Sequence, residues 1–142
     1  MSRKICASCY VVDFEAKELL LVYNPKHKKW LQPGGHTEGE ETPLQTVTRE
    51  VKEETGIDII PIGVKFCDQV EPFAVEIYDT PTEKMLDVQF VAIPKSKVVV
   101  DTEHNSAHWV PLERIISSEE IDKEIKEKFS YILGGIYSAY FR

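Results

Sequence analysis

The sequence predicts a single-domain α/β protein in which a mixed β-sheet is sandwiched between helices. Two observations predict this fold class. β-rich stretches are spread along the chain, and two segments, residues 42–56 and 117–129, have the apolar spacing of amphipathic helices. A chain of 142 residues buries roughly two-thirds of its unfolded surface, which is enough for one hydrophobic core. We therefore expect residues 1–142 to form one domain.

The first predicted helix has clear signals at both ends. Thr42 and Gln45 occupy the two positions of a capping box, and Pro43 stands at the first helical position. Gly56 suits the left-handed residue that ends many helices. Between these ends, an apolar stripe runs through Leu44, Val47 and Val51. The helix can therefore pack on the core by one face and leave another face free.

The second predicted helix begins at a cap formed by Ser117 and Ser118, with acidic residues in its first turn. Its apolar residues recur at Ile121, Ile125 and Phe129. The β-rich stretches that precede it are residues 5–12, 18–23, 30–31, 57–70 with a bend at 61–63, 74–78, 86–93, 98–100 and 108–110. Helices on the two faces of a sheet built from these strands would give the α/β/α sandwich.

Three carboxylates lie on the free face of the first helix. Glu50, Glu53 and Glu54 have the spacing i, i+3 and i+4, so they share one side of the helix. Like charges at this spacing cost roughly 0.2–0.5 kcal/mol per i,i+4 pair on an exposed helix. A cluster of hard oxygen ligands is what Mg²⁺ or Mn²⁺ requires. We therefore interpret the cluster as a metal site, the simpler alternative being a solvated acidic helix.

The segment before this helix is rich in glycine. Gly34 and Gly35 follow Pro33 and allow the main chain to approach a ligand closely. We expect the carbonyl of Gly34 to be an uncharged metal ligand in this turn. Arg49 always carries its charge, so we interpret it as a fixed tether, with Glu41 as its expected partner.

The pattern Gly35-x5-Glu41-x7-Arg49-Glu50-Val51-x-Glu53-Glu54-x-Gly56-Ile57 resembles an intact Nudix box, with every defining position filled. Its flanks are also similar to those of the Nudix hydrolase family (MutT-like proteins), since residues 30–34 precede the box as a short strand and loop would and residues 108–112 resemble an aromatic segment found in many members. The resemblance implies an α/β/α sandwich. It also implies a hydrolase, a pyrophosphohydrolase, that cleaves a nucleoside diphosphate linked to another group, X, such as a nucleoside triphosphate, a nucleotide sugar or an ADP-ribose-like compound.

The resemblance also implies roles for individual residues. Glu50 and Glu54 are the principal ligands of Mg²⁺, or of Mn²⁺, and Glu53 joins them directly or through water. The catalytic groups are then Glu53, Glu103 and Arg49, with Glu41 and Gly56 as structural members of the motif. The base that takes the proton of the attacking water stays open between Glu53 in the box and Glu103 in the polar segment 101–106.

Substrate contacts are less strongly indicated. Gly35 and His36 follow the turn and are candidates for contacting phosphate, although His36 fits a surface position equally well. Lys29 ends the basic run 26–29, which either steers a phosphate or is an ordinary solvated hairpin turn. Aromatic side chains suited to stacking on a nucleobase, with core packing as the alternative, are Trp30, Phe73 and Tyr78. His104 and His108 are expected to make local hydrogen bonds.

Composition restricts the remaining choices. The net charge of −7 argues against a generic nucleic-acid binder, and it would repel a polyphosphate unless a metal reversed the local sign. The sequence shows no leader and no apolar run of the ~20 residues that span a bilayer, so we expect a cytoplasmic protein without a membrane partner. Cys6, Cys9 and Cys67 are expected to be buried and reduced. A homodimer is left open.

Three functions are therefore compatible with the sequence. The first is a metal-dependent hydrolase that acts on small nucleotides or their derivatives. The second is a non-catalytic domain on the same fold that senses a nucleotide or metabolite, which an intact box disfavours. The third is a structural or interaction domain that the acidic helix merely keeps soluble.

Overall fold

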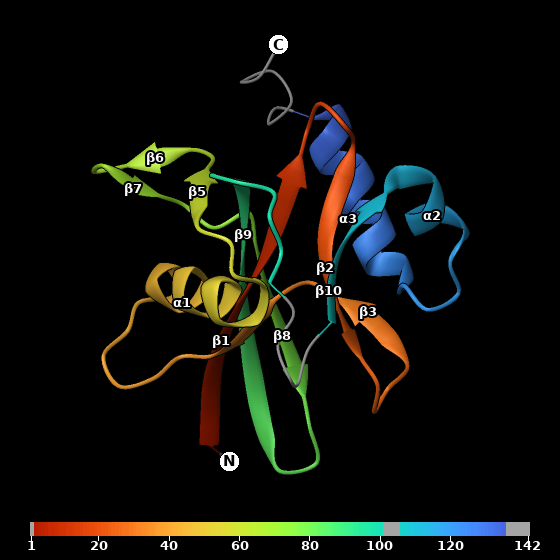
Figure 1. Ribbon diagram of the computed structural model, residues 1–142. Coiled ribbons are helices and arrows are strands. Elements are labelled where there is room, and N and C mark those ends of the chain that lie inside the picture. Colours follow the sequence, from red (N-terminus) through yellow and green to blue (C-terminus); the bar gives the residue numbers. More distant parts are fainter. Residues whose placement is uncertain (1, 101–105, 136–142) are drawn as a thin grey trace.

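The computed structural model describes residues 2–100 and 106–135, and Figure 1 shows their arrangement. The strands are β1 (Ser2–Asp13), β2 (Glu18–Asn24), β3 (Lys29–Leu31), β4 (Gly34–His36), β5 (Ile59–Ile62), β6 (Lys65–Phe66), β7 (Gln69–Val70), β8 (Ala74–Asp79), β9 (Glu83–Pro94) and β10 (Ser106–Pro111). The helices are α1 (Pro43–Thr55), α2 (Leu112–Ser117) and α3 (Lys123–Gly134).

Strand β1 organises the main sheet, whose order is β10-β2-β1-β9-β5. It pairs in parallel with β9 over most of its length, from Ser2 opposite Glu83 to Val11 opposite Ala92. On its other edge, the middle of β1, from Cys6 to Ser8, pairs antiparallel with β4, and its last two residues pair with β2. Because β8 and β5 also pair antiparallel with β9, the sheet is mixed, as predicted.

The helices cover opposite faces of this sheet (Figure 1). Side chains alternate along β1, so that Ala7, Cys9 and Val11 pack under α1 while Tyr10 and Val12 pack under α2 and α3. The core under α1 includes Val47 and Val51 of the helix, and the other core includes Ile115, Ile125, Phe129 and Ile132. The predicted α/β/α sandwich is therefore confirmed. Within the described ranges, no helix is long and apolar enough to cross a lipid bilayer.

Helix α1 has the ends that the sequence predicts. The Thr42 hydroxyl accepts a hydrogen bond from the Gln45 N–H at 3.2 Å, and the Gln45 side chain accepts one from the Thr42 N–H at 2.9 Å. At the other end Gly56 has φ of 79°, and its N–H donates to the Lys52 carbonyl. The capping box and the glycine cap are both confirmed, so local chemistry fixes the length of the acidic helix.

Some predicted elements are wrong. Residues 98–100 form no strand, because the Val100 N–H donates to the Thr55 carbonyl at the end of α1 instead of to a sheet. The helix expected from Ser117 starts at Lys123, since Ser117 ends the unpredicted helix α2. Residues 57–70 divide into three short strands. All three cysteines are free thiols as expected, but Cys67 is exposed and Cys6 only half-buried.

Replacing Gly56 with Ala should lower the free energy of unfolding more than replacing Gly39 with Ala. Both glycines have positive φ, 79° and 53°, and an alanine in that conformation costs about 1–2 kcal/mol. A Cβ on Gly56 would also lie 2.8 Å from Cγ2 of Val100, whereas no atom of the described residues lies within 4 Å of a Cβ on Gly39. We expect a further 1–3 kcal/mol at Gly56, measured by urea unfolding. If both variants lose the same free energy of unfolding, the side chain of Val100 moves aside without cost.

Candidate active site

The guanidinium of Arg49, in the middle of α1, joins the loop before the helix to the helix itself. It binds Glu41 with both edges of its fork, Nε to Oε2 at 2.7 Å and Nη2 to Oε1 at 3.0 Å. Nη2 also donates to the carbonyl of His36 at 3.2 Å. The predicted contact between Arg49 and Glu41 is therefore present, and it ties the end of β4 to the helix.

Glu41 accepts two more hydrogen bonds, from the Glu38 N–H at 2.9 Å and from the Thr46 hydroxyl at 3.1 Å. Hydrogen bonding to Arg49 is the main reason why the pKa of Glu41 falls from 4.5 to about 2. The same contacts raise the pKa of Arg49. Both groups are therefore charged at neutral pH, and an ion pair holds the loop.

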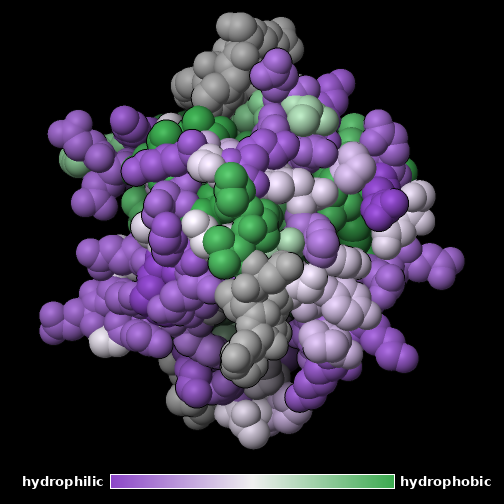
Figure 2. Space-filling view, viewed as in Figure 1, coloured by the Kyte–Doolittle hydropathy of each residue, from purple (hydrophilic) through white to green (hydrophobic). Residues whose placement is uncertain are grey.

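Arg49 also reaches two of the three predicted metal ligands. Its Nη1 lies 2.8 Å from Oε1 of Glu50 and 3.3 Å from Oε2 of Glu53. The side chain of Glu50 is 18% exposed and that of Glu53 is 59% exposed. The two carboxylates therefore differ in setting: Glu50 is held against the sheet, and Glu53 is open to solvent. The side of the molecule on which α1 lies is largely hydrophilic (Figure 2).

The third carboxylate, Glu54, is partly buried, like Glu50. Its Oε1 accepts a hydrogen bond from the Gly34 N–H at 3.0 Å. Burial, together with the nearby charges of Glu50 and Glu53, raises the pKa of Glu54 from 4.5 to about 7. A carboxylate that is disfavoured in its charged form by burial and by two other acids is one that a cation would stabilise.

The two glycines of β4 allow the main chain to touch these carboxylates. A Cβ on Gly35 would lie 2.6 Å from Cδ of Glu50, and a Cβ on Gly34 would lie 2.3 Å from the carbonyl oxygen of Ala7. Neither position has room for a side chain, so close approach is the physical reason for glycine here. The backbone of β4 therefore lies directly against the acidic face of α1.

The donor set suits a hard divalent cation, because it consists of carboxylate oxygens with a backbone carbonyl beside them. Within residues 2–100 and 106–135, however, no three Asp, Glu, His or Cys side chains surround one point at ligand distance. Arg49 and the Gly34 N–H hold the oxygens of Glu50 and Glu54 instead. The chemistry of the residues fits Mg²⁺ or Mn²⁺, while the ligand roles of Glu50, Glu53, Glu54 and Gly34 stay predictions.

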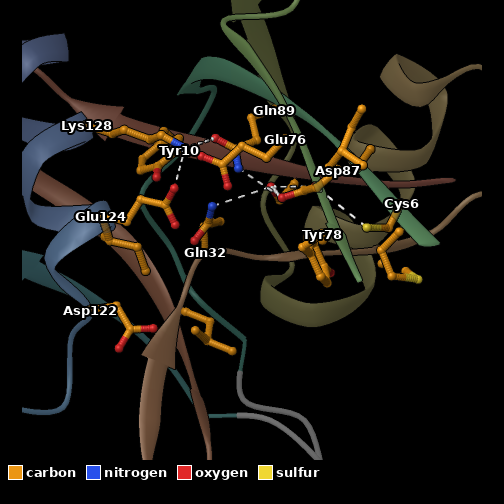
Figure 3. Close-up of a pocket in the computed structure, with 18 of the residues that line it drawn as sticks. Cys6, Tyr10, Gln32, Glu76, Tyr78, Asp87, Gln89, Asp122, Glu124 and Lys128 are labelled. Atoms are coloured by element: carbon orange, nitrogen blue, oxygen red, sulfur yellow. Dashed lines mark hydrogen bonds and ion pairs between the residues drawn. The ribbon is translucent and has the colours of Figure 1, made fainter. Parts of the chain in front are cut away.

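A cavity of about 790 Å³ opens on the other side of β4. Gly34, Gly35 and His36 border it, and its floor comes from β1, β8 and β9 while α3 forms one wall (Figure 3). The polar side chains gathered in it include Ser8, Gln32, Asp87, Gln89 and Lys128. The strand β4 thus separates the acidic helix from a cavity of the size that binds small molecules.

The structure brings only some of the predicted substrate contacts to this cavity. Gly35, His36 and Tyr78 line it, and Lys29 stands near its rim through an ion pair of 3.0 Å with Asp122, which also lines it.

The other predicted residues lie elsewhere. Phe73 packs against the core under α3. Trp30 contacts the rings of Tyr23 and His108 and borders a second cavity, and the predicted local bond of His108 is present, to the Ser106 hydroxyl at 3.0 Å. Glu103 and His104 lie outside the described residues.

The sequence analysis missed the polar groups of the cavity. Asp87 and Gln89 are two residues apart in the otherwise apolar part of β9, and Ser8 interrupts the apolar part of β1 in the same way. Residues at i and i+2 of a strand point to the same face, so this spacing was an available signal. What it could not show is that the two strands are neighbours.

The chain belongs to the NUDIX family, since the model of the NUDIX domain matches residues 2–131. Its fold is similar to that of a NUDIX family hydrolase from Clostridium perfringens, with a TM-score of 0.80, 24% identity and coverage of 94% of this chain and 97% of the other. A MutT protein from Bacillus halodurans has a TM-score of 0.70 at 24% identity, with 93% and 83% covered. These two likenesses concern the fold.

Two curated proteins are similar in sequence. One, from Lactococcus lactis, is named "Probable DHNTP pyrophosphohydrolase" and is 26% identical over 126 residues, which cover 89% of this chain and 62% of that protein. The other is the 8-oxo-dGDP phosphatase NUDT18 of Danio rerio, 32% identical over 108 residues, 71% of this chain and 31% of that protein. The chain therefore spans less than two-thirds of the length of either relative.

Replacing Arg49 with Lys should raise the pKa of Glu41 from about 2 toward its ordinary value of 4.5. A single ammonium cannot bind both oxygens as the guanidinium fork does. Because the pKa of Glu41 is lowered in the folded protein, the stability it contributes is present above pH 4.5 and is lost as the pH falls toward 2. NMR titration of the Glu41 carboxyl measures the change, with the exposed Arg114→Lys as control. A pKa that stays near 2 would mean that Glu38 and Thr46 suffice.

Replacing Glu54 with Gln should change how stability depends on pH in protein free of divalent cations. The folded state holds the Glu54 proton up to about pH 7 and the unfolded state only to about 4.5, so unfolding becomes easier as the pH rises between these values. Gln cannot titrate, so it removes this dependence of stability on pH, and its amide oxygen can still accept the hydrogen bond from the Gly34 N–H. We expect the variant to have a higher Tm than the unchanged protein at pH 8 and a similar Tm at pH 4. Thermal unfolding in EDTA tests this, with the exposed Glu40→Gln as control; parallel pH profiles would contradict it.

Proposed function

We propose that this protein is a metal-dependent Nudix pyrophosphohydrolase that cleaves a diphosphate linkage in a nucleoside diphosphate linked to another group. The observation that carries this proposal is the position of β4. Gly34 and Gly35 touch the carboxylates of Glu54 and Glu50 on one side and border the cavity on the other. A substrate whose ring lies in the cavity would extend its phosphates across this strand to the acidic helix.

The names of the two curated relatives support the reaction class. One is a pyrophosphohydrolase by name and the other a phosphatase that acts on 8-oxo-dGDP, so both names describe hydrolysis of phosphate compounds. The box residues that the family pattern requires are all present in this chain, which disfavours a domain that only senses its ligand. Identity of the group X is left to experiment, because a fold does not fix a substrate.

Glu50 and Glu54 would hold Mg²⁺ or Mn²⁺, with Glu53 and the carbonyl of Gly34 as further ligands. When bound, the metal neutralises the phosphate oxygens and stabilises the leaving phosphate. This requirement agrees with the net charge of −7, which by itself would repel a polyphosphate. The raised pKa of Glu54 also fits such a role, since a nearby cation would favour the charged carboxylate.

Arg49 acts in this proposal as a positioning residue. It fixes Glu50 and the carbonyl of His36 relative to each other, and so sets the distance between the acidic helix and the phosphate path. Glu53 is the described residue best placed to take the proton of the attacking water, because it is 59% exposed and bound only by the longest of the hydrogen bonds that Arg49 makes. Glu103 is kept as the second candidate base.

Gly35 and His36 are proposed to contact the substrate through the backbone of β4, because both line the cavity next to the carboxylates. Lys29 is not placed to contact phosphate directly. Its ammonium is 3.0 Å from Asp122, so it would have to leave this partner to reach a phosphate. We therefore propose that Lys29 attracts substrate at the cavity rim rather than binding it in the reacting position.

Replacing Glu53 or Glu54 with Gln should abolish most turnover while the protein stays folded. Each change removes a charge from the acidic cluster at nearly constant volume, and we expect kcat to fall by about 100-fold or more. The measurement is release of phosphate or pyrophosphate in Mg²⁺ or Mn²⁺ from a panel of nucleoside triphosphates, dinucleoside polyphosphates, ADP-ribose and nucleotide sugars. Glu40→Gln, an exposed change in the same segment, is the matched control.

Unchanged turnover in both variants would remove the hydrolase proposal. Binding of a panel compound in Mg²⁺ without any product would instead favour the sensing domain. Neither binding nor turnover would leave a structural or interaction role.

A further inference from the structure

We propose that the cavity beside β4 selects a planar heterocycle that presents a ring N–H next to an exocyclic amino group, as guanine and pterins do, and that Asp87 accepts those hydrogen bonds. The inference rests on the proposed function, because it names the substrate class of the same site. It is carried by the contacts of one half-buried carboxylate on β9.

Asp87 is surrounded by groups that donate to it (Figure 3). Both of its carboxylate oxygens lie 3.1 Å from the hydroxyl of Ser8, on the neighbouring strand β1. Oδ2 also accepts from the amide nitrogen of Gln89 at 3.0 Å, and the thiol of Cys6 lies 3.7 Å from Oδ1. No ion pair among the described residues involves Asp87, so its charge is met by neutral donors alone.

Lys128 and Gln32, which bind Gln89 and Ser8, fix the direction of the hydrogen bonds to Asp87. The ammonium of Lys128 can only donate, and it lies 2.9 Å from the amide oxygen of Gln89, so the NH₂ of that amide must face Asp87. In the same way Gln32 donates to the Ser8 hydroxyl at 3.4 Å, which leaves the Ser8 proton for the carboxylate. The network therefore presents Asp87 to the cavity as an acceptor.

Asp87 has accepting capacity that the protein does not use. A carboxylate offers about four lone-pair sites, whereas Ser8 has one proton to give, Gln89 directs one amide contact to it, and the Cys6 thiol is a weak donor 3.7 Å away. Burial also raises the pKa of Asp87, which means that the charged form gains from any further donor. A ligand that donates two adjacent hydrogen bonds would supply what the cavity lacks.

The walls of the cavity favour a flat ring at this point. Tyr78 and Met85, which pair across β8 and β9 two residues from Asp87, line the cavity, and so do Leu31 and Ile125. Such apolar and aromatic walls with a few convergent polar groups are typical of small-molecule sites. A ring stacked here would present its edge, rather than its face, to the carboxylate.

The charged end of the ligand would point the other way. Lys128 is the one lysine or arginine of the cavity lining, and it is already bound to Glu76, to Gln89 and, at 3.6 Å, to Glu124. With acidic side chains around it, this end of the cavity does not suit a phosphate. The heterocycle therefore belongs beside Asp87 and the phosphates beside β4.

The hydrogen-bonding groups on the edge of the ring distinguish the common purine bases. Guanine and pterins offer a ring N–H beside an amino group, while hypoxanthine lacks the amino group. Xanthine has a carbonyl there, and adenine has a ring nitrogen that accepts, so either would bring an acceptor against the carboxylate. A two-point match of this kind discriminates by about ten- to hundredfold.

The test compares kcat/KM for GTP, ITP and XTP in Mg²⁺, with dihydroneopterin triphosphate as the pterin arm, in the unchanged protein and in Asp87→Asn. We expect the unchanged protein to prefer GTP over ITP and XTP by about ten- to hundredfold. The variant offers an amide NH₂ in place of one oxygen, so its preference should move to XTP. The ratio of kcat/KM for GTP to kcat/KM for dihydroneopterin triphosphate shows whether the protein prefers guanine or a pterin.

Asp79→Asn is the matched control, because Asp79 is an exposed residue of β8 that pairs with Lys84 and does not line the cavity. Its ranking of the triphosphates should equal that of the unchanged protein. The ranking of the unchanged protein also tests the inference if Asp87→Asn does not fold.

Two results would overturn the inference while the proposed function stands: hydrolysis of GTP, ITP and XTP with similar kcat/KM by the unchanged protein, or an equal loss on all three in Asp87→Asn. If the unchanged protein hydrolyses none of these compounds, and also no other nucleoside triphosphate, dinucleoside polyphosphate, ADP-ribose or nucleotide sugar, the proposed function fails. Calorimetry with GMP, IMP and XMP then decides the inference separately. Tighter binding of GMP, lost in Asp87→Asn, supports it, and absence of such a preference overturns it.

Discussion

The bidentate ion pair between Arg49 and Glu41 is the contact on which the rest of the site depends. It joins the loop after β4 to the middle of α1, and the weaker hydrogen bond between the Thr46 hydroxyl and Glu41 supports it. The guanidinium then has one edge left for Glu50 and Glu53, so the same group that ties the loop also partly neutralises the acidic face. An ammonium in its place would have one charged point for all these partners.

The acidic face is costly by itself, and its neighbours explain how the fold accommodates it. Glu54 is enclosed and close to two other acids, which disfavours its charged form, and the Gly34 N–H only partly offsets this. The glycines of β4 bring the backbone into contact with Glu50 and Glu54, where a side chain would collide with Glu50 or with β1. Unfavourable local electrostatics, confined to one face of one helix, are typical of a site built to bind something positive.

The alternation of β1 and β9 lets one pair of strands serve both the core and the cavity. Ala7, Cys9 and Val11 pack beneath α1, while Cys6 and Ser8 face the cavity on the opposite side. In β9, Asp87 and Gln89 point to that same side. The parallel pairing of these strands places Ser8 opposite Gln89, which is why the hydroxyl reaches the Asp87 carboxylate next to it. The cavity is therefore a product of register, because a shift by one residue would bury these polar groups in the core.

The sequence by itself determined the parts of the protein that depend on near neighbours. Residues 34–56 contain the capping box, the glycine cap, the acidic cluster and the partner of Arg49. Because these groups are close in the sequence, their spacing along the chain is enough to predict their geometry. Fold class followed from the same motif and from the strand and helix periodicities. The start of the second helix and residues 98–100 were misjudged, because Ser117 belongs to α2 and because the Val100 N–H binds the Thr55 carbonyl instead of a strand.

Only the tertiary structure decided the cavity. Ser8 and Asp87 are 79 residues apart, and Lys128 reaches Gln89 from 39 residues away, so no local pattern could pair them. The same holds for Trp30, whose ring is turned toward His108 by the pairing of β2 with β3 and β10. The physical reason is that side chains from distant strands meet through sheet pairing, and a sequence read alone does not reveal which strands pair.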